Sequence, residues 1–150
     1  MGSTLTNLLF HVVFSTKHRA PIIIQNLRNE LFKYMNGIVK GEGGTLLAIG
    51  GTEDHVHCLI KLKPRHPLSE IIKKLKANSS KWANANNKIE GRFAWQSGYA
   101  AYSVSQSQLP LVIGYIAKQE KHHRRRPFKE EYVSLLNKHG VTFDKDYLWN

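Results

Sequence analysis

The sequence has one cysteine, few carboxylates and no long apolar run. The single cysteine, Cys58, excludes an internal disulfide framework and a zinc site built from cysteines. Only 11 Asp and Glu side chains accompany 22 Lys and Arg, which leaves a formal net charge of +11 and a sequence pI of about 9.9. The longest apolar runs, residues 21–24 and 109–113, are too short to span a bilayer, and no charge precedes the first apolar stretch. We therefore expect no membrane partner, no secretory signal and a location in the cytoplasm.

The apolar content is nevertheless sufficient for one hydrophobic core. With 150 residues, of which 41% are hydrophobic and 10% aromatic, the chain suits one domain over residues 1–150. No fixed-period repeat and no low-complexity segment divides it. The excess of positive charge makes polyanions the first partners to consider, because a basic surface attracts phosphate groups at long range.

Hydrophobic periodicity and turn residues predict four strands and four helices. Strands are expected over residues 8–15, 45–49, 56–62 and 99–105. Helices are expected from Leu27 to the glycines at 41–44, from Pro67 past Trp82, from Ser107 to about Lys121, and from Phe128 to about Lys138. This β-α-β-β-α-β order followed by two helices predicts an α+β, ferredoxin-like antiparallel sheet. The first two helices would cover one face of the sheet, and the two C-terminal helices are the available cover for the other.

The first feature that could carry chemistry is the triplet His55-Val56-His57 on the third predicted strand. Side chains alternate across a sheet, so both imidazoles project from one face about 7 Å apart, while Val56 and Cys58 point into the helix-covered core. Two imidazoles placed in this way can bind one divalent ion. The alternative is a pair of histidines on a half-exposed strand with no ligand.

Tyr115 and Gln119 form a second candidate pair on the third predicted helix. A spacing of four residues places both side chains on the same helix face, one turn apart. In the functional interpretation, Tyr115 is a nucleophile and Gln119 an oxygen ligand beside it. In the alternative, both belong to an ordinary core stripe with Val112 and Ile116.

A third feature, the basic run of residues 121–126, follows directly after that helix and could hold phosphate groups near Tyr115 and Gln119. Its alternative is a solvated charged surface. Unpaired bases could stack on four aromatic side chains, each of which could instead be a core residue. These are Trp82, Trp95, Tyr99 and Tyr102.

Taken together, the sequence resembles the single-tyrosine HUH transposases of insertion sequences, a family of small enzymes that act on single-stranded DNA and include the REP-associated tyrosine transposases. The resemblance covers nearly the whole chain and rests on an ordered set of segments rather than on one motif. These segments are residues 8–17, 54–57, 73–76 with 81–82, 95–99, 102–105, 115–120 with 122–123, and 143–149. The family resemblance implies an RRM-like HUH endonuclease fold.

The resemblance also implies roles for particular residues. His55 and His57 match the histidine pair and Gln119 matches the third ligand of a divalent metal, Mg²⁺ or Mn²⁺. Tyr115 matches the nucleophile that attacks the scissile phosphorus and forms a 5′-phosphotyrosine. The strand would be cleaved and rejoined without ATP or another nucleotide cofactor.

The partners implied by the resemblance are single-stranded DNA, DNA hairpins at the ends of the element, and a second copy of the chain in a homodimer. Basic and aromatic side chains would bind the hairpins. We assign this role to Lys73, Lys76, Lys81, Trp82, Arg124, Arg125 and Arg126.

Two other classes of function remain as alternatives. A non-catalytic ferredoxin-like module that binds RNA or single-stranded DNA has the same element order, but it would need exposed aromatics where the third strand carries His55 and His57. A metal-independent phosphoesterase would need two separated H-x-Thr/Ser motifs, and the sequence has no such pair.

Overall fold

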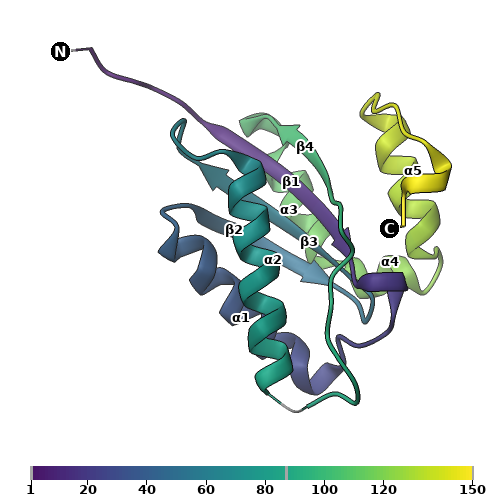
Figure 1. The fold of residues 1–150 in the computed structure, drawn as a ribbon. Coiled ribbons are helices and arrows are strands. Elements are labelled where there is room, and N and C mark those ends of the chain that lie inside the picture. The colour runs from purple at the N-terminus through teal and green to yellow at the C-terminus, as the bar shows by residue number, and fades with distance from the viewer. Residues whose placement is uncertain (1, 87, 150) are drawn as a thin grey trace.

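The computed structural model describes residues 2–86 and 88–149 and contains a four-stranded antiparallel sheet with helices on both faces (Figure 1). The strands are β1 (Leu8–Ser15), β2 (Thr45–Gly51), β3 (His55–Leu62) and β4 (Ala100–Val104). The helices are α1 (Gln25–Gly41), α2 (Leu68–Ala85), α3 (Leu109–Ala117), α4 (Gln119–His123) and α5 (Phe128–Lys138). Within these residues, each helix is too short or too polar to cross a lipid bilayer.

The strand order β2-β3-β1-β4 is the ferredoxin-like order that the sequence predicts. β1 lies in the centre and pairs antiparallel with both β3 and β4. Its register places Val13 opposite His57 and Ser15 opposite His55. The expected α+β fold is therefore confirmed, and the two histidines lie on a central strand of the sheet.

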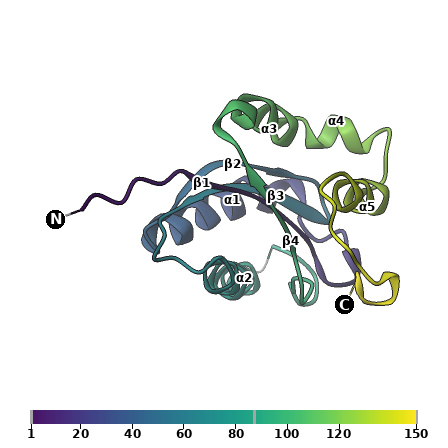
Figure 2. The same ribbon diagram turned by 90° about the horizontal axis from the view of Figure 1, so that it is seen from above.

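The two faces of the sheet carry different helices, as Figure 2 shows. On one face, α1 and α2 pack over a core that includes Val56, Cys58 and Phe14. On the other face lie α3, α4 and α5, where Val13 and Tyr102 pack against Phe128 and other residues of α5. The C-terminal helices therefore cover the face that carries His55 and His57, as the element order predicts.

The third predicted helix differs from the expectation, because it does not run without interruption to Lys121. α3 ends at Ala117, Lys118 leaves the helical conformation with φ −104° and ψ 21°, and α4 begins at Gln119. α4 is linked to α1 by an ion pair. The buried guanidinium of Arg28 on α1 donates from Nη1 to Oε1 of Glu120 on α4 at 2.6 Å. This long-range ion pair, which periodicity does not reveal, fixes the direction of α4 and of Gln119.

Gly50 allows α3 to approach the sheet closely. A Cβ atom built on Gly50 would lie 2.2 Å from the carbonyl oxygen of Ile116, which is closer than any side chain can be. The backbone of α3 therefore rests directly on β2 at this point. Because Tyr115 precedes Ile116, this contact sets the height of the tyrosine above the sheet.

Candidate functional site

His55 and His57 project from β3 toward the C-terminal helices, and their ring centroids are 5.2 Å apart. Both side chains are fully buried, so the alternative of a half-exposed strand is wrong. The ring of His55 stacks on Phe128 of α5 with a centroid distance of 4.0 Å. Buried polar groups require partners, and the C-terminal helices supply them.

Four side chains, His55, His57, His123 and Glu131, bring candidate ligand atoms within 4.8 Å of one another. Oε1 of Glu131 lies 2.9 Å from Nε2 of His57, 3.0 Å from Nε2 of His123 and 3.7 Å from Nε2 of His55. Imidazole and carboxylate groups are the donors that transition metals use in proteins. The donor set thus fits a divalent ion.

Gln119 lies beside this cluster. Its Oε1 is 3.0 Å from Nε2 of His55 and 3.0 Å from Nε2 of His123, and its Nε2 donates to Oε2 of Glu131 at 3.2 Å. Because the amide nitrogen is used by the carboxylate, the amide oxygen is the atom that faces the histidines. The amide oxygen of Gln119 is therefore available as a metal ligand next to the imidazoles of His55 and His123.

Tyr115 completes the group. Its hydroxyl donates a hydrogen bond to Oε2 of Glu131, and its ring centroid lies 5.8 Å from that of His57. The side chain is half-buried, whereas the neighbouring Ile116 is a core residue with 1% exposure. The structure thus brings Tyr115, Gln119 and the histidine pair together within one chain.

Polar partners behind the two rings orient them. Nδ1 of His55 lies 2.8 Å from Oδ1 of Asp54, and Nδ1 of His57 lies 2.8 Å from Nε2 of His11. A carboxylate can only accept, so Nδ1 of His55 carries a proton. Its Nε2 faces the amide oxygen of Gln119 at 3.0 Å. A cation bound between these two atoms would be ligated by both.

The electrostatics of the site centre on Glu131. Burial alone would raise the pKa of its carboxyl group, but hydrogen bonds from His123 and His57 outweigh burial and hold the pKa well below its usual range. Burial lowers the pKa of His57 to about 4, although Glu131 opposes this shift. Burial and the hydrogen bond to Glu131 both raise the pKa of Tyr115. The resting site therefore has an ionised carboxylate, a neutral His57 and a protonated phenol.

Sequence reasoning missed three members of this group: His11, His123 and Glu131. His11 lies on the face of β1 that carries His57 on the neighbouring strand. His123 lies within the run of residues 121–126, in which the sequence pattern indicated only positive charge. Glu131 had a detectable signal, because it lies three residues after Phe128 and four before Leu135, two apolar residues of α5 that pack against the sheet. An acidic residue inside an apolar stripe is rarely buried without a partner.

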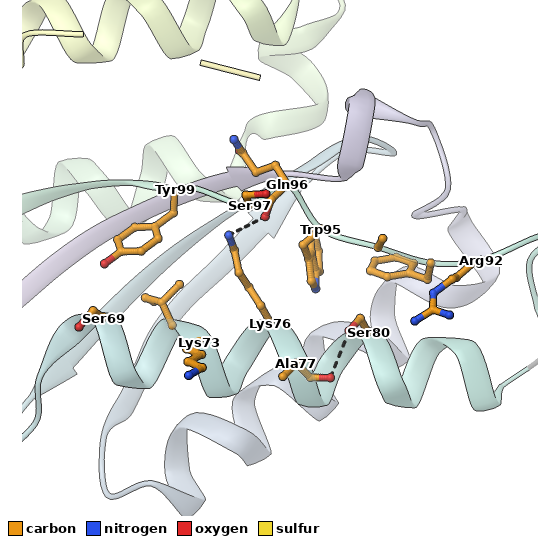
Figure 3. A pocket seen from close by; sticks show the side chains of 13 residues that line it. Ser69, Lys73, Lys76, Ala77, Ser80, Arg92, Trp95, Gln96, Ser97 and Tyr99 are labelled. Carbon is orange, nitrogen blue, oxygen red and sulfur yellow. Dashed lines mark hydrogen bonds between the residues drawn. The ribbon is translucent and has the colours of Figure 1, made fainter. Parts of the chain in front are cut away.

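The residues assigned to DNA binding fall on two surfaces. Figure 3 shows the first, a groove of about 400 Å³ between α2 and residues 92–99 that Lys73 and Lys76 line together with Arg92. Lys81 is exposed on the same helix, and Trp82 stacks half-buried on Tyr34. Arg124, Arg125 and Arg126 are exposed just after α4.

Of the other aromatics considered for stacking, Trp95 and Tyr102 are buried core residues, with 8% and 4% exposure. They offer no platform to a base, so the alternative of a core residue is confirmed for these two. Tyr99 is half-buried and lines the groove in Figure 3.

The second basic surface is a pocket of about 500 Å³ lined by Tyr115, Glu131 and cationic side chains. The cations are Lys118, Lys121, Arg125 and Arg126.

Known proteins are similar to this chain in sequence and in fold. The chain is 22% identical to the ISDra2 transposase TnpA of Deinococcus radiodurans over 117 residues, which cover 75% of this chain and 84% of that protein. It is 22% identical to the transposase for insertion sequence element IS200 of Salmonella typhimurium over 112 residues, 71% of this chain and 74% of the relative.

Two solved structures have a similar fold. A crystal structure assigned as a transposase of D. radiodurans R1 aligns with a TM-score of 0.65 and 23% identity, covering 79% of this chain and 95% of that one. A REP-associated tyrosine transposase bound to a REP hairpin aligns with a TM-score of 0.62 and 12% identity, covering 100% of this chain and 94% of that one. The model of the family described as transposase IS200 like matches residues 4–119. Because this match spans most of the sequence, the chain belongs to the IS200-like transposase family.

Proposed function

We propose that the protein cleaves and rejoins single-stranded DNA through a 5′-phosphotyrosine intermediate, in a metal-dependent reaction that moves an insertion sequence. One observation carries the proposal: the Tyr115 hydroxyl, the amide nitrogen of Gln119 and Nε2 of His57 all contact the Glu131 carboxylate, while the amide oxygen of Gln119 faces Nε2 of His55. We further propose that residues 1–150 act as one HUH transposase domain.

The metal would be held by His55, His57 and Gln119, as the family resemblance implies, with His123 and Glu131 as additional donors. A bound ion supplies Lewis-acid polarisation of a phosphate oxygen and neutralises charge that builds during an in-line displacement. Mg²⁺ prefers oxygen ligands, whereas imidazole suits transition metals. Of the two ions expected, Mn²⁺ therefore fits this nitrogen-rich set better than Mg²⁺.

Tyr115 would carry out the covalent step. Its phenol oxygen forms a bond to the scissile phosphorus while the bond to the 3′ oxygen breaks, which yields a 3′-OH and a 5′-phosphotyrosine. The pKa of a phenol is near 10, far below that of a sugar hydroxyl, so the tyrosine also leaves readily when a 3′-OH attacks later. The reaction is therefore reversible without ATP.

Glu131 is placed to orient the phenol. Its Oε2 accepts the hydrogen bond from Tyr115, while its Oε1 faces His57 and His123. Because the pKa of Tyr115 is raised and that of Glu131 is held low, the proton of the phenol would leave to solvent as the oxygen attacks. The departing 3′ oxygen would take its proton from solvent.

DNA would be held by the two basic surfaces described above. A solved neighbour is bound to a REP hairpin, and this chain carries a net charge of +11. We propose that hairpins near the ends of the element bind through Lys73, Lys76, Lys81, Trp82, Arg124, Arg125 and Arg126, and that the active species is a homodimer. Light scattering of the purified protein with and without a hairpin oligonucleotide tests the dimer.

The central test is the formation of a covalent adduct. The protein is incubated with single-stranded DNA from the region flanking its gene and with Mn²⁺, and the products are separated in denaturing gels. We expect an adduct that EDTA abolishes and that Tyr115→Phe cannot form. Tyr147→Phe is the control, because Tyr147 is 71% exposed and outside the site.

Other outcomes would contradict the proposal. A non-catalytic binding module would shift the DNA in native gels without ever becoming linked to it. A metal-independent hydrolase would cut the DNA in EDTA. An adduct that persists in Tyr115→Phe would assign the nucleophile to another residue.

A further inference from the structure

Tyr115 lies on the border of two separate cavities. One is the basic pocket of about 500 Å³ that it shares with Lys118, Lys121 and Arg126. The other is a cleft of about 550 Å³ that Tyr115 shares with His11 and His139. A nucleophile flanked by two cavities can have substrate on both sides of the atom that it attacks.

The second cavity, which we call the α3–α5 cleft, has walls from two helices and a floor from the sheet. Gln108, Leu111 and Tyr115 follow one another at helical spacing along the α3 wall. Leu135 and His139 form the α5 wall, and His11 of β1 belongs to the floor. Figure 2 shows α3 and α5 on the same face of the sheet.

The two cavities differ in chemistry. Four Lys or Arg side chains line the basic pocket, which suits a phosphodiester backbone. The α3–α5 cleft has one such side chain, Lys138, together with apolar Leu111 and hydrogen-bonding groups from Gln108 and Ser105. No carboxylate is present among its lining residues that the structure describes. Apolar walls with a few polar groups characterise sites for flat heterocyclic ligands, and the volume falls within the roughly 300–1,000 Å³ typical of such sites.

We propose that the α3–α5 cleft receives one of the two nucleobases that flank the scissile phosphate. This inference rests on the proposed function, since it requires that Tyr115 attacks single-stranded DNA. The strand would pass Tyr115 with its backbone in the basic pocket on one side and an unstacked base in the cleft on the other. The cleft would then favour some bases next to the cleavage point over others, through groups such as Gln108 that can donate and accept hydrogen bonds.

Leu111 offers a way to fill the cleft without touching the histidine pair. Its side chain is 67% exposed and lies one helical turn before Tyr115 on the same face, so Leu111→Trp would extend over the cleft. Ile113→Trp is the matched control, because Ile113 lies on the same helix with 37% exposure but does not line the cleft. Thermal unfolding of both variants shows whether either substitution disturbs the fold.

The experiment compares oligonucleotides in a covalent-adduct assay. The cleavage position in single-stranded DNA from the flanking region is first mapped with the wild-type protein. An abasic site is then placed at each neighbour of that position and at a distant nucleotide. We expect one neighbouring abasic site to lower the wild-type rate about tenfold, as the loss of one base contact does. In Leu111→Trp, the intact and abasic oligonucleotides should react at the same reduced rate, whereas Ile113→Trp should behave as wild type.

Three results overturn the inference. Neighbouring abasic sites that leave the wild-type rate unchanged would show that no base is bound. Equal sensitivity to the abasic site in Leu111→Trp and wild type would place the base elsewhere. A changed oligomeric state in Leu111→Trp, without a changed response to the abasic site, would make the cleft a contact between copies of the chain. Absence of any wild-type adduct would instead refute the proposed function itself, and the inference with it.

Discussion

Oε1 of Glu131 lies 2.9 Å from Nε2 of His57, although 74 residues separate the two in sequence. The same carboxylate accepts from Tyr115 through its other oxygen, so one side chain of α5 connects the histidine pair to the phenol. The C-terminal helix is therefore part of the site and not only a cover for the sheet.

Replacing this carboxylate by an amide should impair the chemical step. We expect Glu131→Gln to lower the rate of adduct formation by about 10²-fold, because the neutral amide would hold the Tyr115 hydroxyl less firmly in its attacking position. The rate is measured with saturating single-stranded DNA, and circular dichroism checks the fold. Glu130→Gln is the control, because the adjacent side chain of Glu130 is 65% exposed. Equal rates in Glu131→Gln and wild type would exclude a role for the carboxylate in catalysis.

Gln119→Ala should weaken binding of the metal ion while leaving the fold and hairpin binding intact. Loss of an oxygen donor should reduce the affinity for Mn²⁺ by ~10–100-fold or more, which calorimetric titration would measure. Gln119→Glu keeps an oxygen at this place and should restore binding, and exposed Gln106→Ala should change nothing. If Gln119→Ala unfolds instead, the residue is needed for packing and the assignment as a ligand fails.

A methyl group at Gly50 should disturb the site by pushing α3 away from β2. Because its Cβ would overlap the carbonyl oxygen of Ile116, we expect Gly50→Ala to destabilise the protein by ~1–3 kcal/mol. Displacement of Tyr115 should lower the rate of adduct formation as well, by up to about 10²-fold for a shift near 1 Å. Urea unfolding and the adduct assay measure the two effects.

Gly37 supplies the matched control for that substitution. It lies within α1, and a Cβ atom there would meet nothing within 4 Å. Gly37→Ala should therefore stabilise the helix by ~0.5–1 kcal/mol and leave the reaction unchanged. If both alanine variants behave alike, the contact between α3 and β2 does not position the tyrosine.

DNA binding in the groove of Figure 3 should weaken as the pH rises above neutrality. Burial lowers the pKa of Lys76 to about 8, so this side chain is protonated below pH 8 and loses its charge above it. Its Nζ donates to the carbonyl oxygen of Gln96 at 2.8 Å at the edge of the groove. We expect the affinity for a hairpin oligonucleotide to fall several-fold between pH 7 and pH 9. The slope of log affinity against log salt concentration should be smaller at pH 9 by about 1, as expected when one cation no longer contacts a phosphate.

Arginine at the same position keeps its charge over this range. Lys76→Arg should therefore flatten the dependence of affinity on pH in fluorescence anisotropy titrations, while Lys73→Arg on the exposed side of the groove should not. Identical profiles for Lys76→Arg and wild type would show that Lys76 does not contact the DNA.

Much of this site could be predicted from sequence because it follows from short-range periodicity. Strand alternation places His55 and His57 on one face. The spacing of four residues predicts that Tyr115 and Gln119 lie together, and both contact Glu131 even though they belong to separate helices, α3 and α4. Glu131 could not be placed in this way, since its position depends on how α5 docks on the sheet. The break at Lys118 was missed for a similar reason, because the Arg28–Glu120 ion pair joins elements that are 92 residues apart.

The family match ends at residue 119, whereas Glu131 lies beyond it on α5. A gene copy that lost its last thirty or so codons would still contain the whole segment that the family model matches, residues 4–119. Its product would nevertheless lack the helix that shields both imidazoles from water and presents the carboxylate to the phenol. We therefore expect such a truncated copy of this protein to be inactive, although the family model would still match it.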